Sequence, residues 1–353
     1  MDFTPRPLLS VSLSMILAVA APAVDLTSTA LSWTTSPPID FPVTTVPGVT
    51  HLAYKDPSVV RAKDAWQIYA SRVRHEGGKT RYALAYLSMP TWAQAPQAKV
   101  VHLLDDEQLA CAPFVFRYAR TGTWYVFYVW ENRLTGYAGP AFSTVADIDR
   151  PETFTRPTAC YPDRKAKPST LPKGRWLDFT VIGDDHRMWL YFTDNYGHLL
   201  RSWTSHGSFP LGWSDPEVVL AETTATIFEG SQTYALPGNH GYLTFIEGIG
   251  PQGRRFFTTY TAKTLDGAWT ATGTQADRPF AGPGTVTAPW SVHVSHGELL
   301  RSGVDERVEV DTSGQAALIY QGWDGVSRVP DVPLGKFNGY HEIPWRLGLL
   351  TPR

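Results

Sequence analysis

The strongest constraint on this chain is a long series of short β-rich runs. From about Val49 to Arg353, aromatic and β-branched segments such as "WQIYASRV", "TWYVFYVW", "MWLYFTD" and "RRFFTTYTA" are separated by Gly, Pro, Asn and Asp. Apolar residues recur with a period of two, and the 3.6-residue period of a helix is nearly absent. The sequence therefore predicts an all-β fold.

So many antiparallel strands must protect their edges, as a closed barrel, a sandwich or a propeller does. A stretch of roughly 300 residues is long for a sandwich. Several hairpins share one pattern, in which a polar turn separates two aromatic strands: "RYARTGTWYVFYV", "VIGDDHRMWLYFTD" and "ALPGNHGYLTFIEG". Successive blades of a β-propeller would give this pattern, although the repeat is too irregular to count the blades.

The charge balance excludes one class of partner. The chain has 31 basic and 33 acidic residues and a formal charge of −2, and it contains no basic run that could follow a phosphate backbone. We therefore expect no nucleic-acid partner. The aromatic content of 13% suits both β-sheets and stacking on sugars, so it does not distinguish between them.

The first residues are typical of a secretory signal peptide. Arg6 precedes an apolar run from about Leu8 to Val19, and the small residues Ala21 and Ala23 follow it. The alternative, a membrane anchor, is disfavoured because the run is too short to span a bilayer. We predict a signal peptide over 1–23, a Ser/Thr/Pro-rich segment over 24–48 that leads into the first blade, and a propeller over 49–353. The protein is thus expected to be secreted and extracellular, with no membrane association.

Two cysteines, Cys111 and Cys160, are present in the chain. An oxidising compartment would permit a bridge between them, but the presence of two cysteines does not by itself indicate that they form a disulfide. The sequence leaves this disulfide open.

Three acidic residues lie in apolar surroundings: Asp56 in "YKDPSVV", Asp178 in "WLDFTVIGDD" and Glu229 in "IFEGSQTY". Strict alternation would place Leu177 and Phe179 on one face of a strand and Trp176 and Asp178 on the other. The three acids are far apart in the sequence, so they can meet only if several blades deliver them to a common axis. Taken singly, each could instead be a structural acid at a turn.

Seven segments, in this order, resemble the signature segments of glycoside hydrolase family 62: "KDPSVV", "WLDFTVIGDDHRMWLYFTDNYGHLLRS", "FEGSQTY", "YLTFIEGIGPQGRRFF", "LDGAW", "SHGELLRSG" and "YHEIPWRLGLLT". The resemblance covers roughly residues 45 to 353. Members of that family are secreted α-L-arabinofuranosidases that act on arabinoxylan and related polymers. The resemblance implies a five-bladed β-propeller and a reaction that inverts the anomeric centre.

The same resemblance implies roles for individual residues. Asp56 would be the general base, Glu229 the general acid, and Asp178 the carboxylate that orients the acid and raises its pKa by like-charge repulsion. Inversion requires the acid and the base to lie about 6.5 to 9.5 Å apart, which leaves room for a water molecule. Lys55 and Tyr340 match substrate-binding residues of the pocket.

His296 matches a histidine at the channel axis, where the family often binds calcium largely through waters. We expect no required cofactor, with a structural calcium ion near the axis as the one metal that the resemblance suggests. A zinc site at His293, His296 and Glu298 is disfavoured because the order of a His-Glu-x-x-His helix is absent.

Three positions depart from the family pattern. Phe114 stands where a glutamine is common, and His341 and Glu342 stand where an asparagine and a glutamine are usual. We expect these positions to line the pocket or the xylan cleft, and thus to affect the rate or the preference among backbone chains.

The predicted function is a secreted, inverting α-L-arabinofuranosidase that acts as a monomer on arabinoxylan, with arabinan as a second candidate substrate. Two alternatives remain: another five-bladed glycosidase of the β-xylosidase or arabinanase type, and a non-catalytic carbohydrate-binding propeller. A dinucleotide site at "GIGPQG" is disfavoured, because a strand-like run follows it and we interpret it as a hairpin turn.

Overall fold

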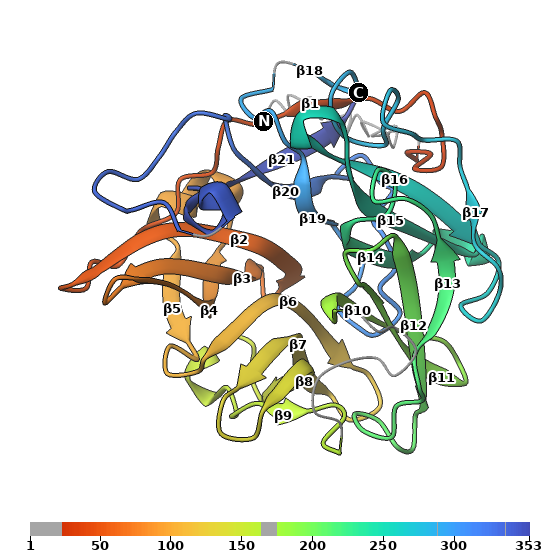
Figure 1. Cartoon of the computed structure of the whole chain (residues 1–353). Coiled ribbons are helices and arrows are strands. Elements are labelled where there is room, and N and C mark those ends of the chain that lie inside the picture. Colours follow the sequence, from red (N-terminus) through yellow and green to blue (C-terminus); the bar gives the residue numbers. More distant parts are fainter. Residues whose placement is uncertain (1–22, 164–174, 288, 336) are drawn as a thin grey trace, which may run out of the picture.

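Five β-sheets surround a central axis in the computed structural model, which describes residues 23–163, 175–287, 289–335 and 337–353 (Figure 1). The inner strands of the five sheets, β2, β6, β10, β14 and β19, lie nearest the axis. The predicted all-β, five-bladed propeller is confirmed. The predicted signal peptide lies, except for its last residue, outside the described residues.

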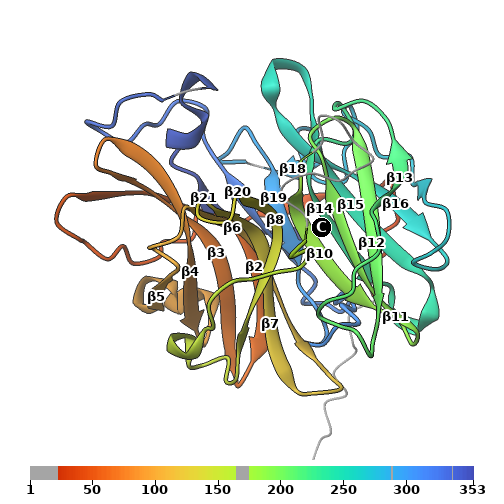
Figure 2. The same cartoon turned by 60° about the horizontal axis from the view of Figure 1, so that its bottom comes forward.

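The first four blades each contain four consecutive antiparallel strands. Their bounds are β2 (Val49–Ala62), β3 (Ala65–Glu76), β4 (Lys79–Met89) and β5 (Lys99–Leu103); β6 (Leu109–Tyr118), β7 (Thr123–Asn132), β8 (Tyr137–Val145) and β9 (Thr158–Ala159); β10 (Leu177–Gly183), β11 (Arg187–Thr193), β12 (His198–Ser205) and β13 (Glu217–Ala221); and β14 (Glu229–Ala235), β15 (Tyr242–Ile249), β16 (Arg255–Ala262) and β17 (Thr270–Ala271). Strands of the first blade are long, and its loops project to the upper left in Figure 2.

Short 3-10 helices connect some strands: η1 (Trp92–Gln97), η2 (Pro151–Thr153), η3 (Pro237–Asn239), η4 (Pro251–Gly253) and η5 (Phe337–Glu342). Because η4 lies between β15 and β16, the "GIGPQG" string is the hairpin turn that the sequence predicted. No helix in the described part of the chain has the length and apolar character needed to cross a bilayer.

The fifth blade joins the two ends of the described chain. Its strands are β18 (Val286–Thr287), β1 (Trp33–Thr35), β21 (Arg346–Pro352), β20 (Leu318–Gly322) and β19 (Ser295–Leu299). β1 pairs antiparallel with β21, and Figure 1 shows the C-terminal end of the chain at this sheet. Trp33 is fully buried, and its Nε1 donates to the carbonyl of Phe280 at 2.6 Å.

The segment 24–48 therefore differs from the sequence-based expectation. We expected it to lead into the first blade, but it also supplies a strand to the last one. Pairing a strand from the start of the chain with one from its end closes the ring and covers an edge that would otherwise be open.

Aromatic residues fill the spaces between blades. Along β7, alternate side chains enter two different clusters: Trp124, Val126 and Tyr128 pack in one, and Tyr125 and Phe127 in the other. Both faces of this strand are buried because a blade has a neighbour on each side. Much of the aromatic content thus serves the core. Cys111 and Cys160 are both free thiols, so the bridge that the sequence left open is not formed.

Candidate active site

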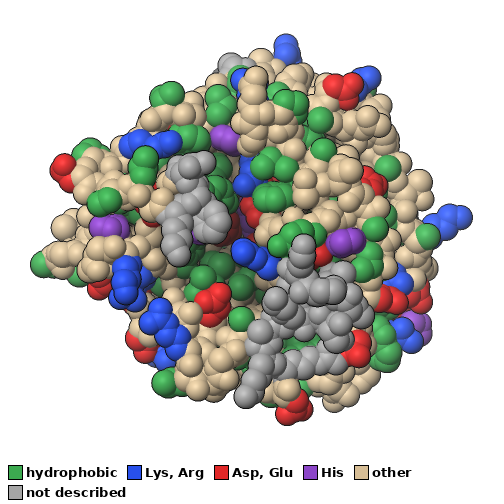
Figure 3. All heavy atoms as spheres, in the orientation of Figure 1, with side chains coloured by type: hydrophobic (Ala, Val, Ile, Leu, Met, Phe, Trp, Pro, Cys, Tyr) green, Lys and Arg blue, Asp and Glu red, His purple; other side chains and the backbone are tan. Residues whose placement is uncertain are grey.

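All six site residues predicted from the sequence line one pocket of about 450 Å³: Lys55, Asp56, Asp178, Glu229, His296 and Tyr340. They come from β2, β10, β14, β19 and η5. Figure 3 shows a hollow at the centre of one face of the propeller, with basic and acidic side chains around it. The structure thus brings together acids from separate blades, as the sequence suggested.

A β-bulge in each inner strand turns the acidic side chains of the site toward the axis. Register shifts occur at equivalent places in β2, β6, β10, β14 and β19. Four residues in the bulges have a positive φ: Asp56 (50°), Ala112 (51°), Asp178 (57°) and Gly230 (65°). Such bulges re-aim side chains and are frequent beside active sites.

The bulge in β10 overturns the strict alternation that we predicted around Asp178. Trp176 and Phe179 were expected on opposite faces, yet both rings pack on Phe192, with centroids 4.7 and 5.9 Å from it. In the bulge, Asp178 and Phe179 together lie opposite Phe192, and with a positive φ at Asp178 the Phe179 ring enters the core while the Asp178 side chain reaches the pocket.

Asp56 is held by several donors, although only 5% of it is exposed. Its Oδ2 accepts a hydrogen bond from the Ser71 hydroxyl at 2.7 Å, and its backbone N–H donates to Gln321 Oε1 at 2.7 Å. Lys55 Nζ lies 3.4 Å from Oδ1, and His296 Nδ1 lies 3.6 Å from it. These contacts fix the orientation of the Asp56 carboxylate, as a general base that must face the attacking water requires.

Glu229 is surrounded by donors as well, and about a fifth of its side chain is exposed. Arg255 Nη1 donates to Oε1 at 2.8 Å, Asn195 Nδ2 donates to Oε2 at 2.9 Å, and the Tyr340 hydroxyl lies 3.4 Å from Oε1. Burial by itself raises the pKa of Glu229, but Arg255, Asn195 and Lys55 outweigh it and lower this pKa overall.

The pKa of Asp178 is shifted in the opposite direction, upward. Burial raises its pKa to about 7, His296 opposes this rise, and the negative charges of Glu229 and Asp56 add to it. Its Oδ2 accepts a hydrogen bond at 2.7 Å from the backbone N–H of Gly230, the residue after Glu229. We expected like-charge repulsion to raise the pKa of Glu229, but in this pocket Asp178 takes that rise, because Arg255 stands beside Glu229 and not beside Asp178.

Lys55 and Tyr340 form one wall of the pocket. Lys55 Nζ lies 5.5 Å from the centre of the Tyr340 ring and 5.8 Å from that of Tyr82. Burial lowers the pKa of Lys55, but Asp56, Tyr340, Tyr82 and Glu229 raise it well above its usual value. Lys55 therefore carries a fixed positive charge next to Asp56.

Two departures from the family pattern anchor the segment that carries Tyr340. Glu342 accepts hydrogen bonds from the Thr80 hydroxyl at 2.6 Å and from the Gly335 N–H at 3.1 Å. His341 lines the pocket as expected, and its Nδ1 lies 2.8 Å from the Tyr82 hydroxyl. Glu342 is buried and does not line the pocket, so the prediction that it does was wrong.

Phe114 does not line the pocket either. It is fully buried, and its ring packs against the guanidinium of Arg301, 5.1 Å from the ring centre. The bulge in β6 ends at this residue, which returns its side chain to the interior. Our expectation that Phe114 shapes the pocket or the cleft is therefore wrong.

Three further residues of the site were missed: Asn195, Glu247 and Arg255. Glu247 and Arg255 are each the single charged residue of a strand, β15 and β16 respectively. The same signal that singled out Asp178 could have revealed them. Asn195 precedes β12 with a positive φ of 65°, which asparagine tolerates better than most residues.

The residues around His296 do not fit a directly bound calcium ion. Within the described residues, no group of three or more His, Cys, Asp or Glu side chains is arranged to hold a metal ion. The acids closest to His296 Nδ1 are Asp56 and Asp178, each 3.6 Å away, and calcium prefers oxygen ligands to an imidazole. His296 is placed here as a partner of two carboxylates.

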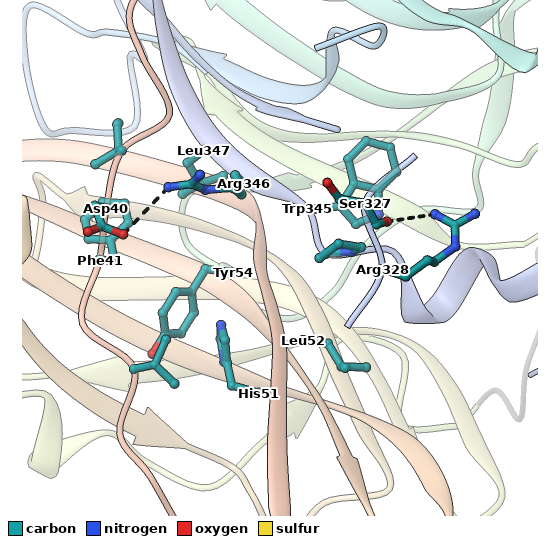
Figure 4. A pocket seen from close by; sticks show the side chains of 13 residues that line it. Asp40, Phe41, His51, Leu52, Tyr54, Ser327, Arg328, Trp345, Arg346 and Leu347 are labelled. Atoms are coloured by element: carbon teal, nitrogen blue, oxygen red, sulfur yellow. Dashed lines mark hydrogen bonds and ion pairs between the residues drawn. The ribbon is translucent and has the colours of Figure 1, made fainter. Parts of the chain in front are cut away.

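A second pocket, of about 300 Å³, lies between the 39–43 segment, β2 and the chain that leads into β21 (Figure 4). Its carboxyl group is Asp40, which faces Arg346 at 3.6 Å. Since its lining has no second carboxylate, this pocket lacks the acid and base pair that glycoside hydrolysis needs.

Comparisons with known proteins agree with this geometry. The family model described as glycosyl hydrolase family 62 matches residues 32–351. Alpha-L-arabinofuranosidase C of Cellvibrio japonicus (strain Ueda107) is 32% identical over 328 residues, which are 91% of this chain and 47% of that protein. The chain thus spans about half the length of this curated relative.

Solved structures are similar over their whole length. The catalytic domain of a family 62 α-L-arabinofuranosidase from Coprinopsis cinerea is 33% identical, with a TM-score of 0.78 and coverage of 92% of this chain and 98% of that one. A family 62 hydrolase in complex with xylotriose is 30% identical, with a TM-score of 0.77 and coverage of 91% and 97%. With a family match over residues 32–351 and all the predicted acids in one axial pocket, this chain belongs to glycosyl hydrolase family 62, as its motifs predicted.

Proposed function

We propose that this chain is an inverting α-L-arabinofuranosidase that removes arabinofuranosyl side chains from arabinoxylan. The observation that carries the proposal is the meeting of Asp56, Asp178 and Glu229, from three blades, in one axial pocket. Relatives named as α-L-arabinofuranosidases support the reaction, and the relative in complex with xylotriose supports a xylan-type backbone.

The arrangement suggests how the two steps of inversion would be divided. Asp56 would take a proton from water while the water oxygen attacks the anomeric carbon. Glu229 would give its proton to the glycosidic oxygen as the carbon–oxygen bond breaks. Asp178, bonded to the N–H after Glu229, would fix the orientation of the acid. Lys55 and Tyr340 are placed to contact the sugar.

Two rival functions are less well supported. Family membership favours an arabinofuranosidase over a β-xylosidase or an arabinanase. A carbohydrate-binding propeller without catalysis would have no need of two buried carboxylates and a third, partly buried one at one axis, because each is costly to desolvate. Secretion, the monomeric state and the role of arabinan as a second substrate remain predictions from the sequence.

The proposal predicts both the product and its anomeric form. With wheat arabinoxylan, we expect free arabinose and no xylose, and proton NMR during the first minutes should show β-arabinofuranose before it equilibrates. Asp40→Asn is a matched control, because it changes a carboxyl in the second pocket, and it should leave the product and the rate unchanged. Release of xylose, or an initial α-anomer, would contradict the proposal.

A chelator should leave the activity unchanged, since the steps assigned above pass through no metal ion. We expect the rate of arabinose release after dialysis against EDTA to remain within about twofold of the untreated rate, a difference of less than about 0.5 kcal/mol in the barrier. Rates after addition of calcium provide the comparison. A loss of activity that calcium restores would show that a metal takes part.

A further inference from the structure

A second glutamate stands behind the candidate acid. Glu229 of β14 lies directly opposite Glu247 of β15 in the strand register, and Glu247 is fully buried. Like charges in directly opposed positions destabilise a sheet unless a cation lies between them. Arg255, from β16, supplies that cation, and the same nitrogen, Nη1, donates to Glu229 and to Glu247.

Glu247 has a complete set of partners of its own. While Oε1 faces Arg255, Oε2 accepts hydrogen bonds from the Ser295 hydroxyl at 2.7 Å and from the His296 N–H at 2.8 Å. Glu247 does not line the pocket, so it acts on the reaction through the residues that it contacts, and among these Arg255 is the one that also donates to Glu229.

The charges around Glu229 explain how Glu247 can affect the protonation of Glu229. The titratable and charged groups that face Glu229 come from every neighbouring element: Lys55 of β2, Asp178 of β10, Glu247 of β15, Arg255 of β16, His296 of β19 and Tyr340 of η5. With Arg255 as its exclusive partner, Glu229 would be a tightly paired anion, which is a poor proton donor. Because Glu247 also pairs with Arg255, part of the positive charge is already neutralised.

We propose that Glu247 is a positioning residue that shares Arg255 with Glu229, and thereby allows Glu229 to take up the proton that it gives to the glycosidic oxygen. The inference rests on the proposed role of Glu229 as general acid. After each turnover Glu229 is left ionised, and it regains a proton from solvent; the negative charge of Glu247 favours that uptake. No movement of the backbone is required.

The directions of the pKa shifts agree with this role. Burial and the charge of Glu229 raise the pKa of Glu247, while Arg255 lowers it. Arg255 likewise lowers the pKa of Glu229. If the charge of Glu247 is removed, Arg255 acts on Glu229 alone, and the pKa of Glu229 must fall further. Since the acid works protonated, its activity would then be lost at a lower pH as the pH rises.

Glu247→Gln tests the proposal, because glutamine keeps the size of the side chain and one acceptor oxygen. We expect the alkaline limb of the kcat/KM profile on arabinoxylan to move to lower pH by on the order of 1 to 2 pH units, the effect of one charge at short range. On 4-nitrophenyl α-L-arabinofuranoside, whose leaving group needs little protonation, we expect the activity to change less than twofold. Because the titrations of Asp178 and Glu229 are coupled, the limb belongs to the group of carboxyls, and its displacement between the unmodified protein and the variant measures the effect of Glu247 on that group.

Glu298→Gln is the matched control, since Glu298 is an equally buried carboxylate paired with an arginine, Arg301, that does not contact Glu229. The alkaline limb of the kcat/KM profile of Glu298→Gln should coincide with that of the unmodified protein. Glu247→Asp keeps the charge farther from Arg255, and we expect a smaller shift of the same sign. This variant decides the matter if Glu247→Gln does not fold, as judged by circular dichroism.

An unchanged alkaline limb in folded Glu247→Gln, or in Glu247→Asp where the first variant does not fold, would overturn the inference. That result would leave the proposed function intact, because hydrolysis of arabinoxylan would persist. A failure of the proposed function would instead appear in the unmodified protein, as absence of arabinose release.

Discussion

Asp56→Asn should slow the release of arabinose from arabinoxylan by on the order of 10²- to 10⁴-fold, because an amide cannot take a proton from the attacking water. The fold should survive the change. Asparagine tolerates the positive φ of 50° at this position, and its side-chain oxygen can still accept the hydrogen bond from Ser71. The backbone bond to Gln321 is not touched.

Initial rates on wheat arabinoxylan and a thermal unfolding curve measure this prediction, with Asp40→Asn as the control for the loss of a carboxyl elsewhere. Added azide offers an independent check. Azide carries no proton, so it needs no base; it can bond to the anomeric carbon as the glycosidic bond breaks, and it should yield the β-glycosyl azide. If Asp56→Asn keeps more than a tenth of the activity, Asp56 is not the base.

Glu229→Gln should separate substrates by their leaving groups. On arabinoxylan, whose leaving oxygen needs a proton, we expect a loss on the order of 10²- to 10⁴-fold. On 4-nitrophenyl α-L-arabinofuranoside the loss should be far smaller, since nitrophenolate leaves without one. The glutamine oxygen can keep the contact with Arg255, and the Asn195 amide can turn to accept from the new NH₂ group.

Comparing kcat/KM of the variant on the two substrates measures the effect, and Asp56→Asn serves as the contrast. Loss of the base should affect both substrates to a similar extent, because both are attacked by water. If Glu229→Gln also reduces both rates equally, Glu229 does not act as the general acid, and the assignment of the acid would have to move to another carboxyl of the pocket.

The sequence determined the features that depend on residue type and local pattern. Alternating aromatic and β-branched runs predicted the strands, and family motifs predicted five blades and the three acids; the structure confirms the blades and brings the acids together. Both kinds of signal are local, because strand propensity and a short motif are each contained within a few residues.

Other features were decided only by the tertiary structure. A bulge at Asp178 interrupted the expected alternation, and β1 pairs with β21 of the last blade, which closes the ring. Arg255 lowers the pKa of Glu229, and β16 places this arginine beside the glutamate. The sequence around Glu229 contains no pattern that predicts the contact. Charge interactions depend on distances between groups on different strands and blades, and those distances exist only once the strands are packed.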